Sequence, residues 1–340
     1  MDYTKEFQDR RELLQRLETM GLEVPDRRVA LDCLTRVGYF RSAAYRYVFR
    51  EHLAPEDVDE RLRQYRRDTY VPGASIEHVM KLEAFDFKLG RVCLEGLLDF
   101  EVRLRASIAH TLAAKDVAAH VSVECLDRQK CNQPKGETTK FEAWVETCRQ
   151  AVRAAAEDED FLTHHLLKYP RQEVPVWAVT EVLSFGSLPY LFDLMVSSDA
   201  RAVAQSFGFT HPRMFGVVIR MMVDFRNASA HGPRLFNRVF KRAFSLGPHQ
   251  TSGDMLEHLL AAEFTATPKP KQRLYIYAAC LAFVLTSHSS GSAWPLAFKT
   301  QLRKFHVDVR AEDGADLVSP YLSMGFPRNW EDLALWKPNT

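Results

Sequence analysis

Apolar residues recur at helical spacing from the start of the chain, and alternating strand-like patterns are scarce. Residues 7–24 place apolar side chains every three or four positions and reach Gly21, a residue type that often ends helices. A second helix is predicted to begin at Pro25 and Asp26, because both residue types favour the first positions of a helix. The N-terminal pattern therefore predicts two short helices joined by a tight turn.

The same helical period continues without interruption from residue 75 to about residue 114. Its apolar positions predict either one very long helix or two helices joined near Gly90 or Gly96. Residues 127–140 are polar and predict a loop, after which the helical pattern resumes at Phe141.

Two further helices are predicted in the second half of the chain. One begins near His211, and the other is an apolar segment that ends near Thr286. The pattern as a whole predicts an all-α protein with a helical core over residues 75–245. Residues 1–74 and 246–340 are predicted to form helical additions at its two ends.

The composition is that of a globular protein, and the near-zero net charge gives no indication of a charged binding partner. The chain has 340 residues, 46% of them hydrophobic and 26% charged, and a net charge of +1, as expected for a globular protein. The longest apolar run, residues 274–285, is too short to cross a bilayer, and the N-terminus lacks a signal-peptide core. We therefore expect a cytoplasmic protein with no membrane partner.

The usual motifs of several enzyme classes are missing from the sequence. The six cysteines form no C-x-x-C pair, and His164 and His165 have no ligand partner at helical spacing. Neither a metal site nor a bound cofactor is therefore expected. No glycine-rich phosphate loop, zinc-protease motif or serine-hydrolase motif occurs either.

Two arginine–histidine pairs stand five residues apart: Arg105 with His110, and Arg226 with His231. About one such spacing is expected by chance, so the spacing alone is weak evidence. The first pair lies inside the long apolar pattern and has Ala106 after its arginine, which favours a packing role. The sequence leaves open whether Arg105 and His110 form a second site.

The second pair has more favourable surroundings. Asn227 and His231 are four residues apart and share a helical face, with the long side chain of Arg226 beside them. Gly232 and Pro233 then end the helix, because the residue before proline is disfavoured in the α conformation. His231 is therefore predicted at a helix terminus, where it can titrate near neutral pH.

These three side chains suit RNA cleavage without a metal ion. A histidine can remove the proton from a ribose 2′-hydroxyl, which then attacks the adjacent phosphorus. An arginine can hold the phosphate and offset its growing charge, and an asparagine can orient either group. Arg234 and Arg238 add two more cations beside the motif. From the residues alone, an ordinary capped helix end remains an equal alternative.

Residues 36–50 form a second candidate surface. The segment holds four arginines and five aromatic residues with no acidic residue, a combination that suits phosphate contacts and base stacking. Arg41, Arg46 and Arg50 are the candidate RNA-binding residues. The alternative, which the residues alone slightly favour, is an aromatic segment that packs on the core with its arginines in water.

Five blocks of sequence, in the same order, resemble the Abi-like abortive-infection proteins of bacteria (the AbiD/AbiF group). The resemblance covers nearly the whole chain. The second block is the long helical pattern of residues 76–113. The first, third, fourth and fifth are LTRVGYFRSAAYRYVFR, VPVWAVTEVLSFGSLPYLF, RNASAHGPRLFNR and MGFPRNWEDLALW.

That family is similar to the HEPN superfamily of helical-bundle ribonucleases, in which an R-x4–6-H motif carries catalysis. The resemblance implies a HEPN-type bundle, catalysis by Arg226, Asn227 and His231, and a homodimer in which two motifs face each other. Two positions depart from the family pattern: Gly232 replaces a frequent second histidine, and Phe236 replaces a tryptophan. The first departure affects the expected pKa or phosphate contact of the site.

Three functions follow as hypotheses. The first is a metal-independent endoribonuclease of anti-phage defence that leaves 2′,3′-cyclic phosphate ends, with RNA as substrate and a non-coding RNA as a further partner. The second is a non-catalytic protein that binds structured RNA through residues 36–50. The third is a structural or signalling dimer whose motif only holds the interface.

Overall fold

The protein is mostly helical, as the sequence predicts. A computed structural model describes residues 6–62, 64–230, 234–251, 253–261, 264–265, 267–287, 291–307, 309 and 316–337. Within these ranges 61% of the structure is helix and 6% is strand, and there are fourteen α-helices. The expectation of a helical protein without a sizeable sheet is confirmed.

The N-terminal region contains three short helices and a two-stranded antiparallel sheet. The turn predicted at Gly21 is present, and this glycine has a φ of 91°. Asp26 caps the second helix, as expected, because its carboxylate accepts the backbone N–H groups of Arg28 and Val29. The elements are α1 (Arg10–Thr19), α2 (Arg27–Arg36), α3 (Tyr39–Arg46), β1 (Arg50–His52) and β2 (Arg66–Tyr70).

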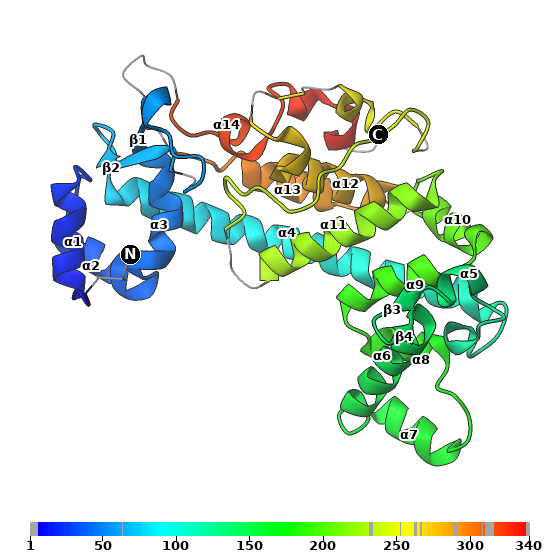
Figure 1. Cartoon of the computed structure of the whole chain (residues 1–340). Coiled ribbons are helices and arrows are strands. Elements are labelled where there is room, and N and C mark those ends of the chain that lie inside the picture. The colour runs from blue at the N-terminus through cyan, green and yellow to red at the C-terminus, as the bar shows by residue number, and fades with distance from the viewer. Residues whose placement is uncertain are drawn as a thin grey trace.

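A single helix of 38 residues, α4 (Ile76–Ala113), forms the axis of the molecule (Figure 1). Gly90 and Gly96 do not break it; Gly96 instead serves close packing, whereas a Cβ atom at position 90 would make only an ordinary van der Waals contact. A Cβ atom at position 96 would lie 2.5 Å from Nε1 of Trp294, and one at position 90 would lie 3.8 Å from the carbonyl oxygen of Ser229. The Trp294 indole N–H donates to the carbonyl of Val92 at 2.7 Å.

The other large helices pack around α4. The N-terminal elements gather at its beginning, and residues 119–206 gather around its far end, whereas α11 returns along its middle (Figure 1). Five helices that follow α4 in the sequence contact it: α8 (Val176–Val182), α10 (Ser197–Ser206), α11 (Pro212–Ala230), α12 (Leu274–Thr286) and α13 (Trp294–Leu302).

Smaller elements complete the bundle. Residues 127–140, predicted to be a loop, contain one helical turn and a hairpin, because Asp127 caps the turn and Gly136 adopts a φ of 65° between the two strands. These elements are α5 (Arg128–Cys131), β3 (Pro134–Lys135) and β4 (Thr138–Thr139), followed by α6 (Lys140–Ala155), α7 (Asp160–Lys168) and α9 (Leu188–Leu194), with α14 (Pro320–Met324) near the C-terminus.

The hydrophobic core is continuous along α4. Phe100 in the middle of α4 makes edge-to-face contacts with the rings of Phe185, Phe207 and Phe215. Residues 274–285 of α12 are all buried, which explains why this apolar run has no polar face. No helix among the described residues is both long enough and apolar enough to cross a membrane.

Candidate active site

Arg226 and Asn227 lie in the last described turn of α11. The guanidinium of Arg226 donates from Nη1 to the Asn227 side-chain oxygen at 3.2 Å. Asn227 is exposed, whereas the Arg226 side chain retains 26% of its accessible surface. His231 follows Ala230 directly in the sequence but, with Gly232 and Pro233, lies outside the described residues. The structure therefore brings two of the three predicted catalytic residues together.

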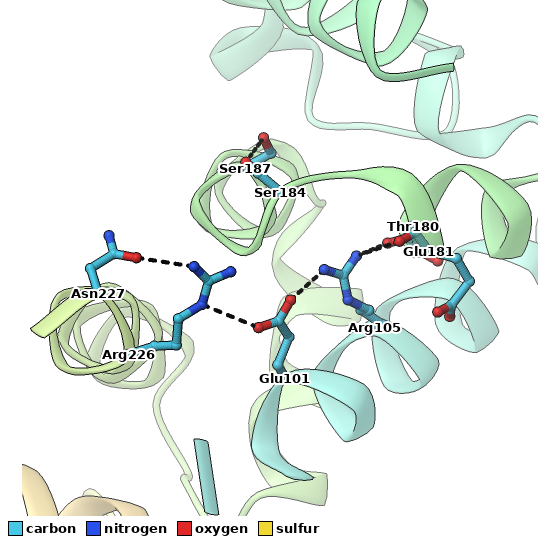
Figure 2. A network of polar contacts seen from close by, with 8 residues as sticks. All are labelled: Glu101, Arg105, Thr180, Glu181, Ser184, Ser187, Arg226 and Asn227. Carbon is cyan, nitrogen blue, oxygen red and sulfur yellow. Dashed lines mark hydrogen bonds and ion pairs between the residues drawn. The ribbon is translucent and has the colours of Figure 1, made fainter. Parts of the chain in front are cut away.

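Glu101 on α4 links Arg226 to a second arginine (Figure 2). Its Oε2 lies 3.7 Å from Nε of Arg226, an ion-pair distance that is too long for a hydrogen bond. Its Oε1 accepts from Nη2 of Arg105, one turn further along α4. Two arginines thus share one carboxylate, and the cluster keeps a net positive charge.

Arg105 is buried and held from two sides. Besides Glu101, its Nη1 donates to the backbone carbonyls of Thr180 and Glu181 at the end of α8. His110 is exposed on the same helix, so the two residues of this pair face different surroundings. These contacts agree with the packing role that the sequence favours for Arg105. Arg105 also helps to position Glu101, which in turn pairs with Arg226.

The segment after α8 forms the other wall of the site. Phe185 begins a 3-10 turn, Phe185–Ser187, and its buried ring lies 5.9 Å from the Arg226 guanidinium carbon. Such a contact between a guanidinium and an aromatic ring favours a fixed orientation of the cation. Next to it the hydroxyls of Ser184 and Ser187 are 2.9 Å apart (Figure 2).

A buried carboxylate fixes the chain immediately after the motif. Asp86 on α4 accepts the backbone N–H of Leu235 at 3.0 Å, the N–H of Phe236 at 2.7 Å and the Tyr45 hydroxyl at 2.8 Å. Burial raises the pKa of Asp86 above its usual value, although these donors and the nearby Arg234 oppose the shift. Leu235 and Phe236 are therefore attached to α4 through a carboxylate that Tyr45 of α3 also binds.

Arg234 and Arg238, predicted to bind RNA, differ in availability. Arg234 donates from Nη1 to the Ala44 carbonyl at 2.9 Å, and burial lowers the pKa of its guanidinium. The guanidinium carbon of Arg238 lies 5.3 Å from the centre of the Phe240 ring. Arg234 thus serves mainly to hold the segment against α3. RNA contact by these two arginines remains a prediction.

The three arginines predicted in residues 36–50 are not equivalent. Arg46 is only 1% exposed, donates to the Tyr39 carbonyl at 2.8 Å and lies over the Tyr39 ring. Arg50 pairs with Asp68 at 2.8 Å, and Arg41 is exposed. We therefore assign Arg46 a packing role, because its enclosed guanidinium cannot reach an external phosphate. Phosphate contact stays a prediction for Arg41 and Arg50.

Comparison with known families decides the class of the protein. The sequence model described as Abi-like protein matches residues 32–237, which is more than half of the chain. The chain belongs to this family. Membership implies a role in abortive-infection defence against phage and assigns no catalytic residue. No curated protein and no solved structure matches this Abi-like protein.

Sequence reasoning missed three residues that shape the site of this Abi-like protein: Asp86, Glu101 and Phe185. The spacing of Glu101 and Arg105, four residues apart on a predicted helix, was the one local signal for an ion pair. Within the described ranges, no group of three or more histidine, cysteine or carboxylate side chains is arranged to hold a metal ion.

Proposed function

We propose that this Abi-like protein is an endoribonuclease that uses Arg226, Asn227 and His231. The observation that carries the proposal is the position of the Arg226 guanidinium, which is partly exposed, bonded to Asn227 and supported by Glu101 and Phe185. In the described part of the chain, its Nη2 has no hydrogen-bond partner. A phosphate oxygen is a suitable acceptor for that nitrogen.

The proposed reaction needs no group besides these side chains and the RNA. His231 removes the proton of a ribose 2′-hydroxyl, and the oxygen attacks the adjacent phosphorus. Arg226 offsets the charge that grows on the phosphate oxygens, while Asn227 orients Arg226. The bond from phosphorus to the 5′-oxygen breaks and that oxygen takes up a proton. The products are a 2′,3′-cyclic phosphate and a 5′-hydroxyl.

Substrate chemistry tests this mechanism directly. Cleavage of single-stranded RNA is expected to continue in EDTA and to stop when each ribose 2′-hydroxyl is replaced by hydrogen, because that hydroxyl is the nucleophile. End analysis by mass spectrometry should find cyclic phosphates. Efficient cutting of the 2′-deoxy strand, or a requirement for a divalent ion, would show that the mechanism is different.

The proposed active form is a homodimer. The sequence predicts that His231 ends the helix that carries Arg226, and residues five apart on a helix differ by roughly 140° in direction. Arg226 and His231 of one chain are then expected to point apart and to act poorly on one phosphate. Two copies that pair their motifs remove this difficulty by combining Arg226 of one chain with His231 of the other.

Mixing inactive variants tests the shared site. Arg226→Ala and His231→Ala chains, each inactive alone, are expected to regain activity when co-refolded, because each mixed dimer contains one intact pair. Sedimentation should give a mass near twice the 39.0 kDa of one chain. An active protein that sediments as a monomer would rule out the shared site.

Non-catalytic RNA binding is the second candidate function. One observation favours it: Glu101 already supplies a carboxylate to Arg226, as in a structural ion pair. In that case RNA would bind to the protein and remain intact, and His231→Ala would leave its affinity unchanged.

A further inference from the structure

A basic cavity lies beside the beginning of α11, away from the residues discussed so far. It has a volume of about 390 Å³ and is lined partly by Lys135, Lys140, Tyr190 and Arg213. These residues come from the β3–β4 hairpin, α6, α9 and α11. Three separate parts of the sequence thus bring these three cations and the Tyr190 ring to a single hollow, which Lys130 and Phe192 also line.

Lys135, Lys140 and Arg213 have no carboxylate partner among the residues that the structure describes, whereas Lys130, the fourth cation of the lining, pairs with Asp127. Lys140 donates to the side-chain oxygen of Gln133 at 2.6 Å, which leaves its charge uncompensated. Asp193 is the acidic residue in the lining, and it pairs with Arg220 outside the cavity. The cavity therefore retains an excess of positive charge.

Helix stability does not explain these cations. Lys140 is the first residue of α6 and Arg213 is the second residue of α11. The helix dipole places partial positive charge at these ends, so cations there are mildly unfavourable to folding. Their positions therefore suggest that the cations serve an anionic ligand.

Tyr190 indicates which kind of anion fits the cavity. Its side chain is 55% exposed, and the Lys135 ammonium lies 4.6 Å from the centre of its ring. An exposed aromatic ring beside unpaired cations is the combination that binds single-stranded nucleic acid, in which bases stack and phosphates meet cations. A simple inorganic anion would make no use of the ring.

A second hollow of about 220 Å³ lies next to the basic cavity, on the side of the segment that follows Phe185. Its lining includes Tyr190, which it shares with the basic cavity, together with Gly186 and Val223. Gly186 follows Phe185 in sequence, and Val223 is one helical turn before Arg226. From Arg213 to Arg226 the path along α11 is about 20 Å, a length that a few nucleotides can span.

We propose that the basic cavity binds a single-stranded segment of RNA beside the cleavage site, with phosphates on Lys135, Lys140 and Arg213 and a base on Tyr190. The proposal rests on RNA being the ligand of the proposed function. It assigns the substrate class as unpaired RNA, because a base within a duplex cannot stack on a protein side chain.

Binding measured without cleavage tests the cavity independently of the chemistry. Full-length protein carrying Arg226→Ala is titrated with fluorescent single-stranded RNA of about 12 nucleotides. The triple variant Lys135→Glu, Lys140→Glu and Arg213→Glu is expected to bind at least about tenfold more weakly. The slope of log affinity against log salt should fall in magnitude by about 2, since each phosphate that a cation neutralises contributes about 0.7 to that slope.

A matched control separates the cavity from general charge. Lys81→Glu, Lys88→Glu and Lys304→Glu change the net charge equally at exposed positions elsewhere, and this variant is expected to keep most of its affinity. Because glutamate is favourable at a helix beginning, the cavity variant should keep its melting temperature. Equal affinity and equal salt slope for cavity variant and parent would overturn the proposal.

Tyr190 supplies a second, local readout. Tyr190→Phe is expected to retain binding and Tyr190→Ala to weaken it, and RNA that carries a photoreactive base should crosslink to the peptide containing Tyr190. A duplex of the same sequence that binds as tightly as the single strand would contradict the assignment to unpaired RNA. If RNA binds at the cavity but is never cut, the proposed nuclease fails while the cavity assignment stands.

Discussion

Arg226→Ala is expected to lower the rate of RNA cleavage by about 10²-fold or more. The substitution removes the group that offsets charge on the phosphate in the transition state, and such interactions contribute at least this much to catalysis. Arg226→Lys should not restore the rate, because an ammonium cannot present two parallel N–H donors to a phosphate. Single-turnover rates measured with excess protein report this effect without a contribution from product release.

His231→Ala is expected to cause a similar loss, because it removes the proposed general base. The chain offers a control for each substitution. Arg103→Ala removes a partly exposed arginine that pairs with Asp99 and donates to the Leu285 carbonyl of α12, and His110→Ala removes an exposed histidine. Both controls should cleave at nearly the wild-type rate. An unchanged rate for a folded Arg226→Ala protein would refute the proposed role.

Asp86→Ala is expected to lower the free energy of unfolding by about 3–5 kcal/mol. The substitution leaves two backbone N–H groups and the Tyr45 hydroxyl buried without their acceptor, and each unsatisfied donor costs about 1–3 kcal/mol. Urea denaturation followed by circular dichroism measures the change. The segment from Arg234 onward should also become more accessible to proteases.

Asp99→Ala provides the matched comparison for Asp86, since both aspartates are on α4. Asp99 pairs with Arg103 in a partly exposed position, and ion pairs that water reaches typically contribute less than about 1 kcal/mol. If Asp86→Ala were no less stable than Asp99→Ala, the Asp86 carboxylate would not be an anchor of the fold.

Local signals account for the parts of the fold that sequence predicted well. Asp26 caps α2 and Gly21 ends the turn before it, because both effects act within a few residues. The sequence left open whether Gly90 or Gly96 interrupts α4, because the residues that decide this are distant in sequence. A helix break and a close approach by another helix look alike until Trp294, about two hundred residues away, is placed beside Gly96.

Only the part of the candidate site that lies on α11 was predictable from the sequence. Arg226 and Asn227 are adjacent, and their association follows from the sequence. Glu101 and Phe185 reach them from α4 and from the turn after α8, through contacts that no local pattern encodes. Arg46 was mispredicted for the same reason. The arginine-rich composition of residues 36–50 suggested that its side chain is exposed to solvent, but the structure packs it against the Tyr39 ring.

The contact between Gly96 and Trp294 has an evolutionary consequence. The family match ends at residue 237, yet α13, which carries Trp294, packs on α4 inside the matched region and leaves no room for a side chain at position 96. A relative that lacks α13 is free of this steric restriction and can accumulate larger residues there. Glycine at this position should therefore be inherited together with the C-terminal tryptophan, so that gain or loss of the C-terminal region leaves a trace within α4.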